Sequence, residues 1–88
     1  MTHLISITEL KKEDHIIVDV RTAEEVEADP IGDALHMELT TIPHRHNELS
    51  KDKLLAFVCA GNIRSAQAVE YLKGLGYNNV CVLDKFSL

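Results

Sequence analysis

The sequence has little positive charge and no long apolar run. Its 88 residues include 9 Lys and Arg against 14 Asp and Glu, a net charge of −5. It therefore lacks the basic surface typical of nucleic-acid or anionic-membrane binding. No apolar run approaches the length of a bilayer span, and residues 1–6 lack the basic region and apolar core of a signal peptide. We expect a cytoplasmic protein with no nucleic-acid or membrane partner.

Cysteine is scarce, and metal-ligand patterns are missing. Cys59 and Cys81 lie 22 positions apart, without the paired spacing of a zinc site. Three histidines could suggest a metal site: His36, His44 and His46. However, His44 and His46 are two positions apart and would not lie on the same face of a helix. We therefore expect surface histidines, no metal and no cofactor. Because thiols stay reduced in the cytoplasm, we expect any cysteine chemistry to be carried out by a single cysteine.

What the sequence does contain predicts one small domain over residues 1–88. Capping boxes at Ser6–Glu9 and Thr22–Glu25 each predict the start of a helix. A further helix is expected from its cap at Thr41 to about Leu49, and another from Ser65 to Gly76. The apolar face of this last helix is Ala68, Val69, Leu72 and Leu75. Short apolar runs predict strands at residues 4–5, 16–20, 34–37, 54–58 and 80–83.

This alternation of strands and helices predicts the α/β class. Short connections favour a doubly wound parallel sheet of four to five strands, with right-handed crossovers and helices on both faces. In such sheets, ligands bind outside the carboxyl ends of the strands. The loops that follow the strands are therefore the places to look for a site.

One of these loops carries a cysteine. Cys59 follows the apolar run 54–58 and precedes a helix, so it should meet the unpaired N–H groups and the positive end of the helix dipole. Both favour the thiolate, which is the reactive form. Arg64 adds a fixed positive charge. Cys81, in contrast, lies between Val80 and Val82 in a strand and is expected to be a buried, inert thiol rather than a resolving partner.

Asp19 and Arg21 end the strand 16–20 at the same edge of the sheet as Cys59. They predict either an ion pair that fixes a loop or a support for the cysteine loop. The two roles are compatible, and we favour the structural one because ionic networks are commoner than catalytic ones.

The order of these motifs resembles a single-domain rhodanese (thiosulfate sulfurtransferase) over nearly the whole chain. The resemblance rests on Ile17 to Arg21 followed by Glu25, on Ile31 and Ala34 in a degraded second motif, and above all on the loop Cys59 to Ser65. In this family a cysteine opens a six-residue loop that commonly closes on Arg and is followed by Ser. The resemblance implies the rhodanese-like fold.

The chain departs from the family pattern in three places. Gly61 stands two residues after the cysteine, and Asn62 holds the place of the usual glycine; Asn tolerates left-handed backbone, so we expect the loop to close. Residues 29–34 replace the usual Gly-His-Ile-Pro-Gly-Ala. After the last strand comes only Asp84 to Leu88, without the family's Trp-containing helix. We therefore expect an abbreviated C-terminal helix, with either a partner chain or a shortened fold at that face.

The resemblance implies sulfur transfer in two steps. The Cys59 thiolate attacks the outer sulfur of thiosulfate, sulfite leaves, and cyanide or a thiol later accepts sulfur from the Cys59 persulfide. The backbone N–H groups of the loop would cradle the persulfide, and Arg64 would hold an anionic donor. The loop offers only one basic side chain, which would bind a dianionic donor weakly, so a neutral or protein-borne persulfide is an equally open choice of donor. The cradle residues are Ala60, Gly61, Asn62, Ile63, Arg64 and Ser65.

Two other functions remain open. Cysteine phosphatases and arsenate reductases also close a cysteine loop on Arg, but six residues after the cysteine. Here Arg64 is five after Cys59, and the narrower cradle favours sulfur. A non-catalytic rhodanese binding module is the second alternative. Expected partners are a small-molecule sulfur donor and a thiol acceptor, including a protein persulfide or a thioredoxin-like protein, with a monomer or weak homodimer.

Overall fold

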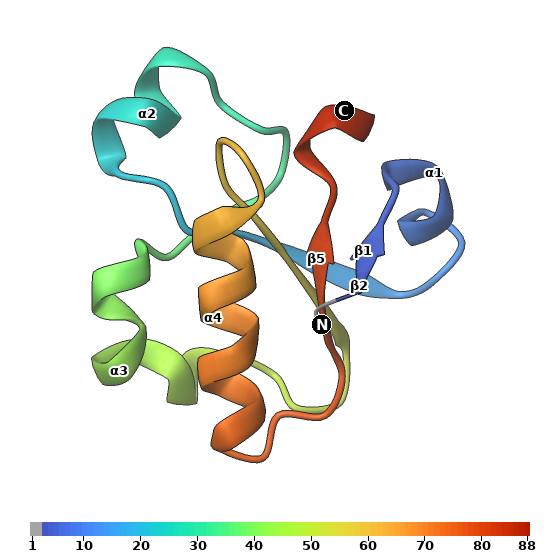
Figure 1. Cartoon of the computed structure of the whole chain (residues 1–88), viewed down its shortest axis with the longest axis vertical. Helices are drawn as coiled ribbons and strands as arrows, with labels where there is room; N and C mark the ends of the chain where they lie inside the picture. Colours follow the sequence, from blue (N-terminus) through green and yellow to red (C-terminus); the bar gives the residue numbers. More distant parts are fainter. Residues whose placement is uncertain (1–2) are drawn as a thin grey trace.

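A computed structural model, which describes residues 3–88, has a parallel sheet at its centre. The sheet order is β1-β5-β4-β2-β3, and every neighbouring pair is parallel. The predicted doubly wound parallel sheet is therefore confirmed (Figure 1). The strands are β1 (Leu4–Ile5), β2 (His15–Asp19), β3 (Leu35–His36), β4 (Leu54–Val58) and β5 (Val80–Leu83).

Short helices and turns connect these strands. Both predicted capping boxes form: Ser6 and Glu9 cap α1, and Thr22 and Glu25 cap α2. Each box satisfies two backbone N–H groups at the start of its helix. The α-helices are α1 (Ile7–Leu10), α2 (Ala23–Ala28), α3 (Ile42–Arg45) and α4 (Ile63–Gly74), and the 3₁₀ helices are η1 (Leu39–Thr41), η2 (His46–Glu48) and η3 (Lys85–Ser87).

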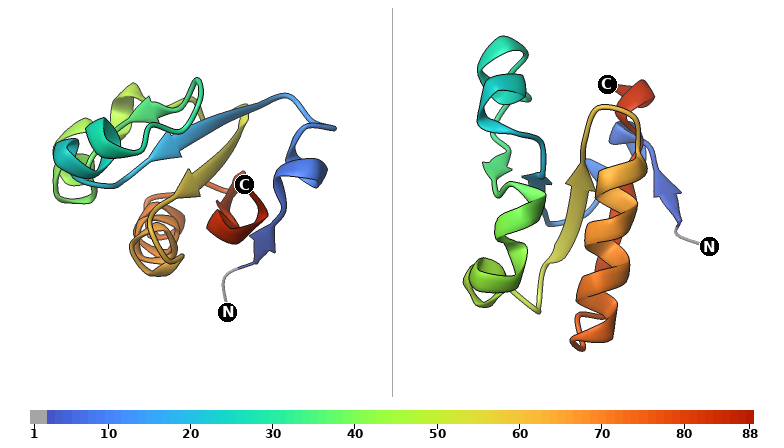
Figure 2. Two further views of the ribbon diagram at one scale, coloured as in Figure 1. Left: turned by 90° about the horizontal axis from the view of Figure 1, so that it is seen from above. Right: turned by 60° about the vertical axis from the view of Figure 1, so that its left-hand side comes forward.

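Helices cover both faces of the sheet, as predicted. Side chains alternate between the two faces along each strand: in β4, Leu55 and Phe57 pack with α3 and α4, whereas Ala56 and Val58 face the opposite core beside α1. Figure 2 shows α4 and α1 on opposite sides of the sheet. The larger core includes Val18, Val20, Met37, Ile42, Leu55, Phe57, Ala68, Val69, Leu72 and Val82.

Two helix predictions were wrong in detail. The segment from Thr41 to Leu49 is not one helix but the sequence η1, α3 and η2. Thr41 does not cap it, because its hydroxyl donates to the carbonyl of Glu38 at 2.7 Å. In α4, Leu75 lies past the last helical residue and is 41% exposed, so it is not part of the apolar face.

The C-terminal residues form one short turn instead of a longer helix. Asp84 accepts a hydrogen bond from the Phe86 N–H and so caps η3. The hydroxyl of Ser87 accepts the N–H of Ile7 at 2.9 Å. This end of the described chain therefore packs beside the start of α1 (Figure 1). Within residues 3–88, no helix has the length and apolar character needed to cross a membrane.

Candidate functional site

Cys59 lies directly after β4, at the carboxyl edge of the sheet. The N–H of Val20 donates to the carbonyl of Val58 at 3.0 Å, so the ends of β2 and β4 are held together. The sulfur of Cys59 accepts the backbone N–H of Ser65 at 3.3 Å, and the hydroxyl of Ser65 is also 3.3 Å away. Cys59 is 1% exposed and Ser65 is fully buried. The sulfur therefore sits at the bottom of the loop rather than on an open surface.

The surroundings of Cys59 favour its thiolate. Burial alone raises the pKa of a thiol, but hydrogen bonds from the Ser65 side chain and from the backbone of Ser65, Gly61 and Arg64 outweigh it and lower the Cys59 pKa. Because Ser65 is the third residue of α4, the sulfur also faces the positive end of the helix dipole. This arrangement makes Cys59 a stronger candidate nucleophile than a thiol without these hydrogen bonds.

The loop turns at Asn62 instead of at a glycine. Asn62 has a φ of 68°, in the left-handed region, and α4 begins at the next residue. Gly61 does not need this freedom, because its φ lies outside that region and an added Cβ would meet nothing within 4 Å. The loop closes with Asn in the glycine place, as the sequence led us to expect. Ala60, Gly61 and Ile63 are exposed on its outer side.

Arg64 forms an ion pair with Glu25, a contact that the sequence did not predict. Its two terminal nitrogens donate to the two carboxylate oxygens of Glu25, at 2.6 and 2.8 Å. The guanidinium beside Glu25 lowers the pKa of that carboxyl to about 2, and Glu25 raises the pKa of Arg64. The positive charge expected to hold an anionic donor is thus already balanced. The sequence predicted that Glu25 caps a helix. The start of that helix lies at the same edge of the sheet as the cysteine loop, and this shared edge was the signal that could have indicated a contact between Glu25 and Arg64.

Asp19 and Arg21 form a buried ion pair, with side chains 2% and 4% exposed. Three side-chain hydrogen bonds of 2.8 to 3.2 Å join them, and Arg21 also donates to the carbonyl of Asp29 at 2.7 Å. A ring nitrogen of His36 lies 2.8 Å from the carbonyl of Arg21. These contacts join the end of β2 to the end of α2 and to β3. They favour the structural role for the pair.

Cys81 lies on the other face of the sheet from Cys59. It pairs in register with Ala56, is 7% exposed, and belongs to the core beside α1. Burial, with a smaller contribution from the charge of Glu13, raises the pKa of Cys81 to about 11. Both cysteines are free thiols. The geometry agrees with an inert Cys81.

Other concave and polar features do not coincide with the cysteine loop. An apolar hollow of about 220 Å³ lies between α3 and α4 and shares no residue with the segment 59–65. Within the described residues 3–88, no group of three or more His, Cys, Asp or Glu is placed to hold a metal ion.

Comparison with known proteins agrees with this geometry. The family model described as "Rhodanese-like domain" matches residues 6–86. A sulfurtransferase of Allochromatium vinosum is 40% identical over 68 residues, covering 77% of this chain and 64% of that protein. A tRNA uridine(34) hydroxylase of Rickettsia rickettsii is 34% identical over 77 residues, 81% of this chain but 31% of that protein. The chain therefore spans less than two thirds of the length of these relatives.

The same likeness holds for solved structures. The crystal structure of a rhodanese-like domain protein from Staphylococcus aureus superposes with a TM-score of 0.81 and is 38% identical. The match covers 96% of this chain and 86% of that one. The five-stranded sheet and its helices thus have the same arrangement in a protein of similar length.

Proposed function

The chain belongs to the rhodanese-like domain family, and we propose that it is a sulfurtransferase that carries sulfane sulfur on Cys59. Sulfurtransferase relatives support rhodanese-type sulfur transfer in general. The observation that carries the proposal is the sulfur of Cys59 at the start of α4, with the N–H and hydroxyl of Ser65 both at 3.3 Å.

The reaction proceeds in two balanced steps. The Cys59 thiolate attacks the outer, sulfane sulfur of the donor; the donor S–S bond breaks, and its remaining sulfur leaves as sulfite or a thiolate. Cys59 then carries a persulfide, whose terminal anion the loop N–H groups stabilise. An acceptor thiolate attacks that terminal sulfur, and Cys59 leaves as a thiolate. The helix dipole and the Ser65 hydrogen bonds stabilise the charge at both ends of the cycle.

The balanced charge of Arg64 bears on the donor. Glu25 offsets Arg64, and Asp19 offsets Arg21 in the same way. A dianion such as thiosulfate therefore meets little net positive charge at the loop and gains little electrostatic attraction. An alkyl persulfide carries less charge, so its binding depends less on that attraction. We propose a small-molecule or protein-borne persulfide as the preferred donor and a thiol as the acceptor. A thiol acceptor and a thiolate nucleophile suit a reducing compartment, so we place the reaction in the cytoplasm.

The phosphatase alternative has less support at this site. A cysteine phosphatase needs donors that surround a tetrahedral oxyanion, and the guanidinium is the natural bidentate partner for phosphate. Here both terminal nitrogens of Arg64 are bonded to Glu25.

One assay separates the proposed functions. The protein is mixed with an alkyl persulfide or thiosulfate and a thiol acceptor, and in parallel with an aryl phosphate; Cys59→Ser and Cys81→Ser serve as matched variants. Sulfur transfer that is lost in Cys59→Ser and kept in Cys81→Ser is expected. Aryl phosphate hydrolysis that depends on Cys59 would favour the phosphatase, and no turnover with any donor would favour a binding module.

A further inference from the structure

Asn62 occupies the position before α4 but does not cap the helix. An Asn with extended backbone at this position ordinarily accepts a backbone N–H from the second or third helical residue, but the backbone of Asn62 is left-handed. Here its side chain makes no such bond. Instead its amide nitrogen donates to the carboxylate of Asp84 at 3.1 Å, and its side-chain oxygen accepts the N–H of Lys85 at 3.0 Å. Both polar atoms are thus used in contacts more than 20 residues along the chain.

The N–H group that a cap would take is used by Cys59. Ser65 is the third residue of α4, and its N–H donates to the sulfur of Cys59 at 3.3 Å. The sulfur therefore occupies the place of the capping acceptor. A side chain at position 62 that turned back onto the helix would compete with the sulfur for this N–H. Because Asn62 is held by Asp84 and Lys85, the N–H stays available.

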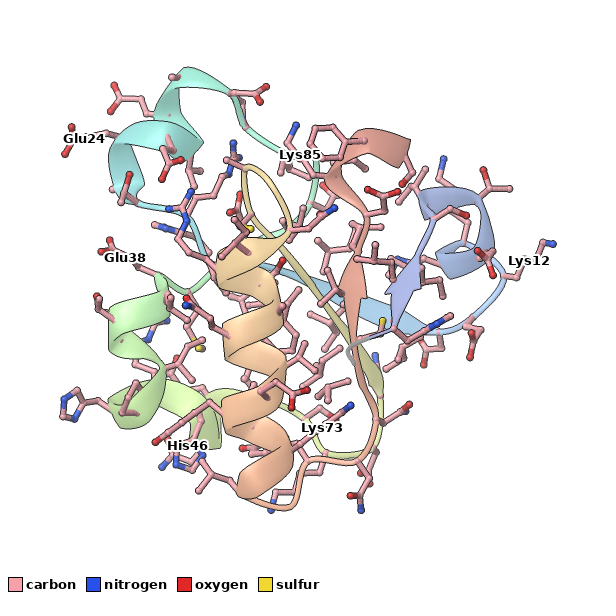
Figure 3. All side chains as sticks on the ribbon, in the orientation of Figure 1. Lys12, Glu24, Glu38, His46, Lys73 and Lys85 are labelled. Atoms are coloured by element: carbon pink, nitrogen blue, oxygen red, sulfur yellow. The ribbon has the colours of Figure 1, made fainter. Side chains whose placement is uncertain are left out.

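The segment that holds Asn62 is itself fixed to the sheet. The N–H of Asp84 donates to the carbonyl of Ile5 at 2.8 Å, and Ser87 bonds both to the carbonyl of Asp84 and to the N–H of Ile7. Figure 3 shows Lys85 beside the loop that leads into α4. The turn of residues 84–87 is therefore a firm support, and Asn62 joins the cysteine loop to it.

We propose that Asn62 is a positioning residue for Cys59: its side chain ties the cysteine loop to the turn at Asp84 and Lys85 and leaves the Ser65 N–H to the sulfur. This role is distinct from the left-handed backbone that Asn62 shares with glycine. Only its effect on turnover rests on the proposed sulfur transfer; its effect on the thiol does not.

The test compares variants of Asn62 with a matched control. Asn62→Gly keeps the left-handed backbone and removes both side-chain bonds. Asn62→Asp places a carboxylate opposite Asp84, so that it turns towards the helix N-terminus and competes with the sulfur. Asp84→Ala removes one of the two bonds of the tether, together with the cap of η3, and leaves the bond from the Lys85 N–H. Asn78→Gly, at an exposed position, controls for the flexibility that glycine adds. The readouts are the iodoacetamide rate of Cys59 against pH, kcat and KM for sulfur transfer, and the thermal midpoint.

For Asn62→Gly we expect a fall of about tenfold in the neutral-pH alkylation rate, because a loop without its two bonds to Asp84 and Lys85 holds the Ser65 N–H less firmly against the sulfur. The alkylation midpoint should move to higher pH, and kcat should fall more than KM changes. Asn62→Asp and Asp84→Ala should shift the rate and the midpoint in the same direction as Asn62→Gly, so that the result does not depend on the folding of one variant.

Rates for Asn62→Gly and Asp84→Ala within twofold of the unmodified protein would overturn the proposal, as would an equal loss in Asn78→Gly. If no variant, including the unmodified protein, transfers sulfur but the alkylation rates fall as described, the positioning role stands and the proposed function fails.

Discussion

Arg64 and Glu25, 39 residues apart in the sequence, form a two-fold hydrogen-bonded ion pair at 2.6 and 2.8 Å. The pair joins the first turn of α4 to the first turn of α2, and each of the two side chains is about one-third exposed. Because Arg64 was expected to bind the donor, this contact decides how much positive charge the loop presents. It also links the cysteine loop to the capping box of α2.

Releasing Arg64 should improve the use of an anionic donor. Glu25→Gln removes the negative charge but keeps a side chain that suits the capping box with Thr22. We expect the KM for thiosulfate to fall about fivefold, as for the loss of one partly exposed opposing charge, with little change for an alkyl persulfide. Because the pKa of Glu25 is about 2, the difference should persist from pH 5 to pH 8.

Steady-state kinetics with the two donors measure this effect. Glu48→Gln is the matched control, because it removes the negative charge of an exposed ion pair with Arg45 that does not involve the cysteine loop. It should leave both KM values unchanged. Equal changes for the two donors in Glu25→Gln would contradict the charge argument.

Ser65→Ala should make Cys59 a weaker nucleophile at neutral pH. The variant removes the hydroxyl 3.3 Å from the sulfur and keeps the backbone N–H. Hydrogen bonds to the thiolate lower its pKa, so their loss moves the alkylation midpoint to higher pH, by about 1 unit for one charge-assisted bond. Ser50→Ala, which removes a hydroxyl that accepts two turn N–H groups away from the site, should not move it. An unshifted midpoint in Ser65→Ala would show that the hydroxyl does not act on the thiolate.

Arg21→Met should destabilise the fold strongly. It leaves the carboxylate of Asp19 buried without its partner, which costs about 3–5 kcal/mol. Arg45→Met breaks an exposed ion pair and should cost far less stability than Arg21→Met. Urea unfolding measures both. In the folded fraction of Arg21→Met, the alkylation midpoint of Cys59 should stay near that of the unmodified protein, since Arg21 makes no hydrogen bond to the loop among the described contacts. A loss below 1 kcal/mol would contradict the structural role.

Labelling should find one reactive thiol in the native protein. With its pKa raised to about 11 by burial, Cys81 is ionised to about one part in ten thousand at pH 7. Iodoacetamide at pH 7 should therefore modify one cysteine per chain, and none in Cys59→Ser. In denaturant the unmodified protein should take two labels. Rapid labelling of both thiols under native conditions would remove the distinction between the cysteines.

Much of the fold followed from local patterns in the sequence. Apolar runs bounded by turns predicted all five strands, and β5 has the expected bounds, Val80–Leu83. Both capping boxes formed because their hydrogen bonds join residues three positions apart. The helix expected from Thr41 failed for a local reason as well: the Thr41 hydroxyl bonds backward to Glu38 instead of forward to the helix.

The candidate site was predicted in position but not in its side-chain partners. Cys59 and Ser65 are near in sequence, so the loop and the helix start could be inferred together. The contacts of Arg64 with Glu25 and of Asn62 with Asp84 join segments 39 and 22 residues apart. Such contacts depend on which strand ends meet at the sheet edge and on side-chain rotamers, and no spacing rule gives them.

The mass of the intact protein after exposure to a sulfane donor tests most directly whether Cys59 carries sulfur. The unmodified chain and Cys81→Ser, treated with an alkyl persulfide or thiosulfate and then desalted, should each gain the mass of one sulfur atom. A thiol acceptor should remove that atom, and Cys59→Ser should gain nothing. If no donor adds sulfur to the unmodified protein, or if Cys59→Ser gains it equally, Cys59 is not the sulfur carrier.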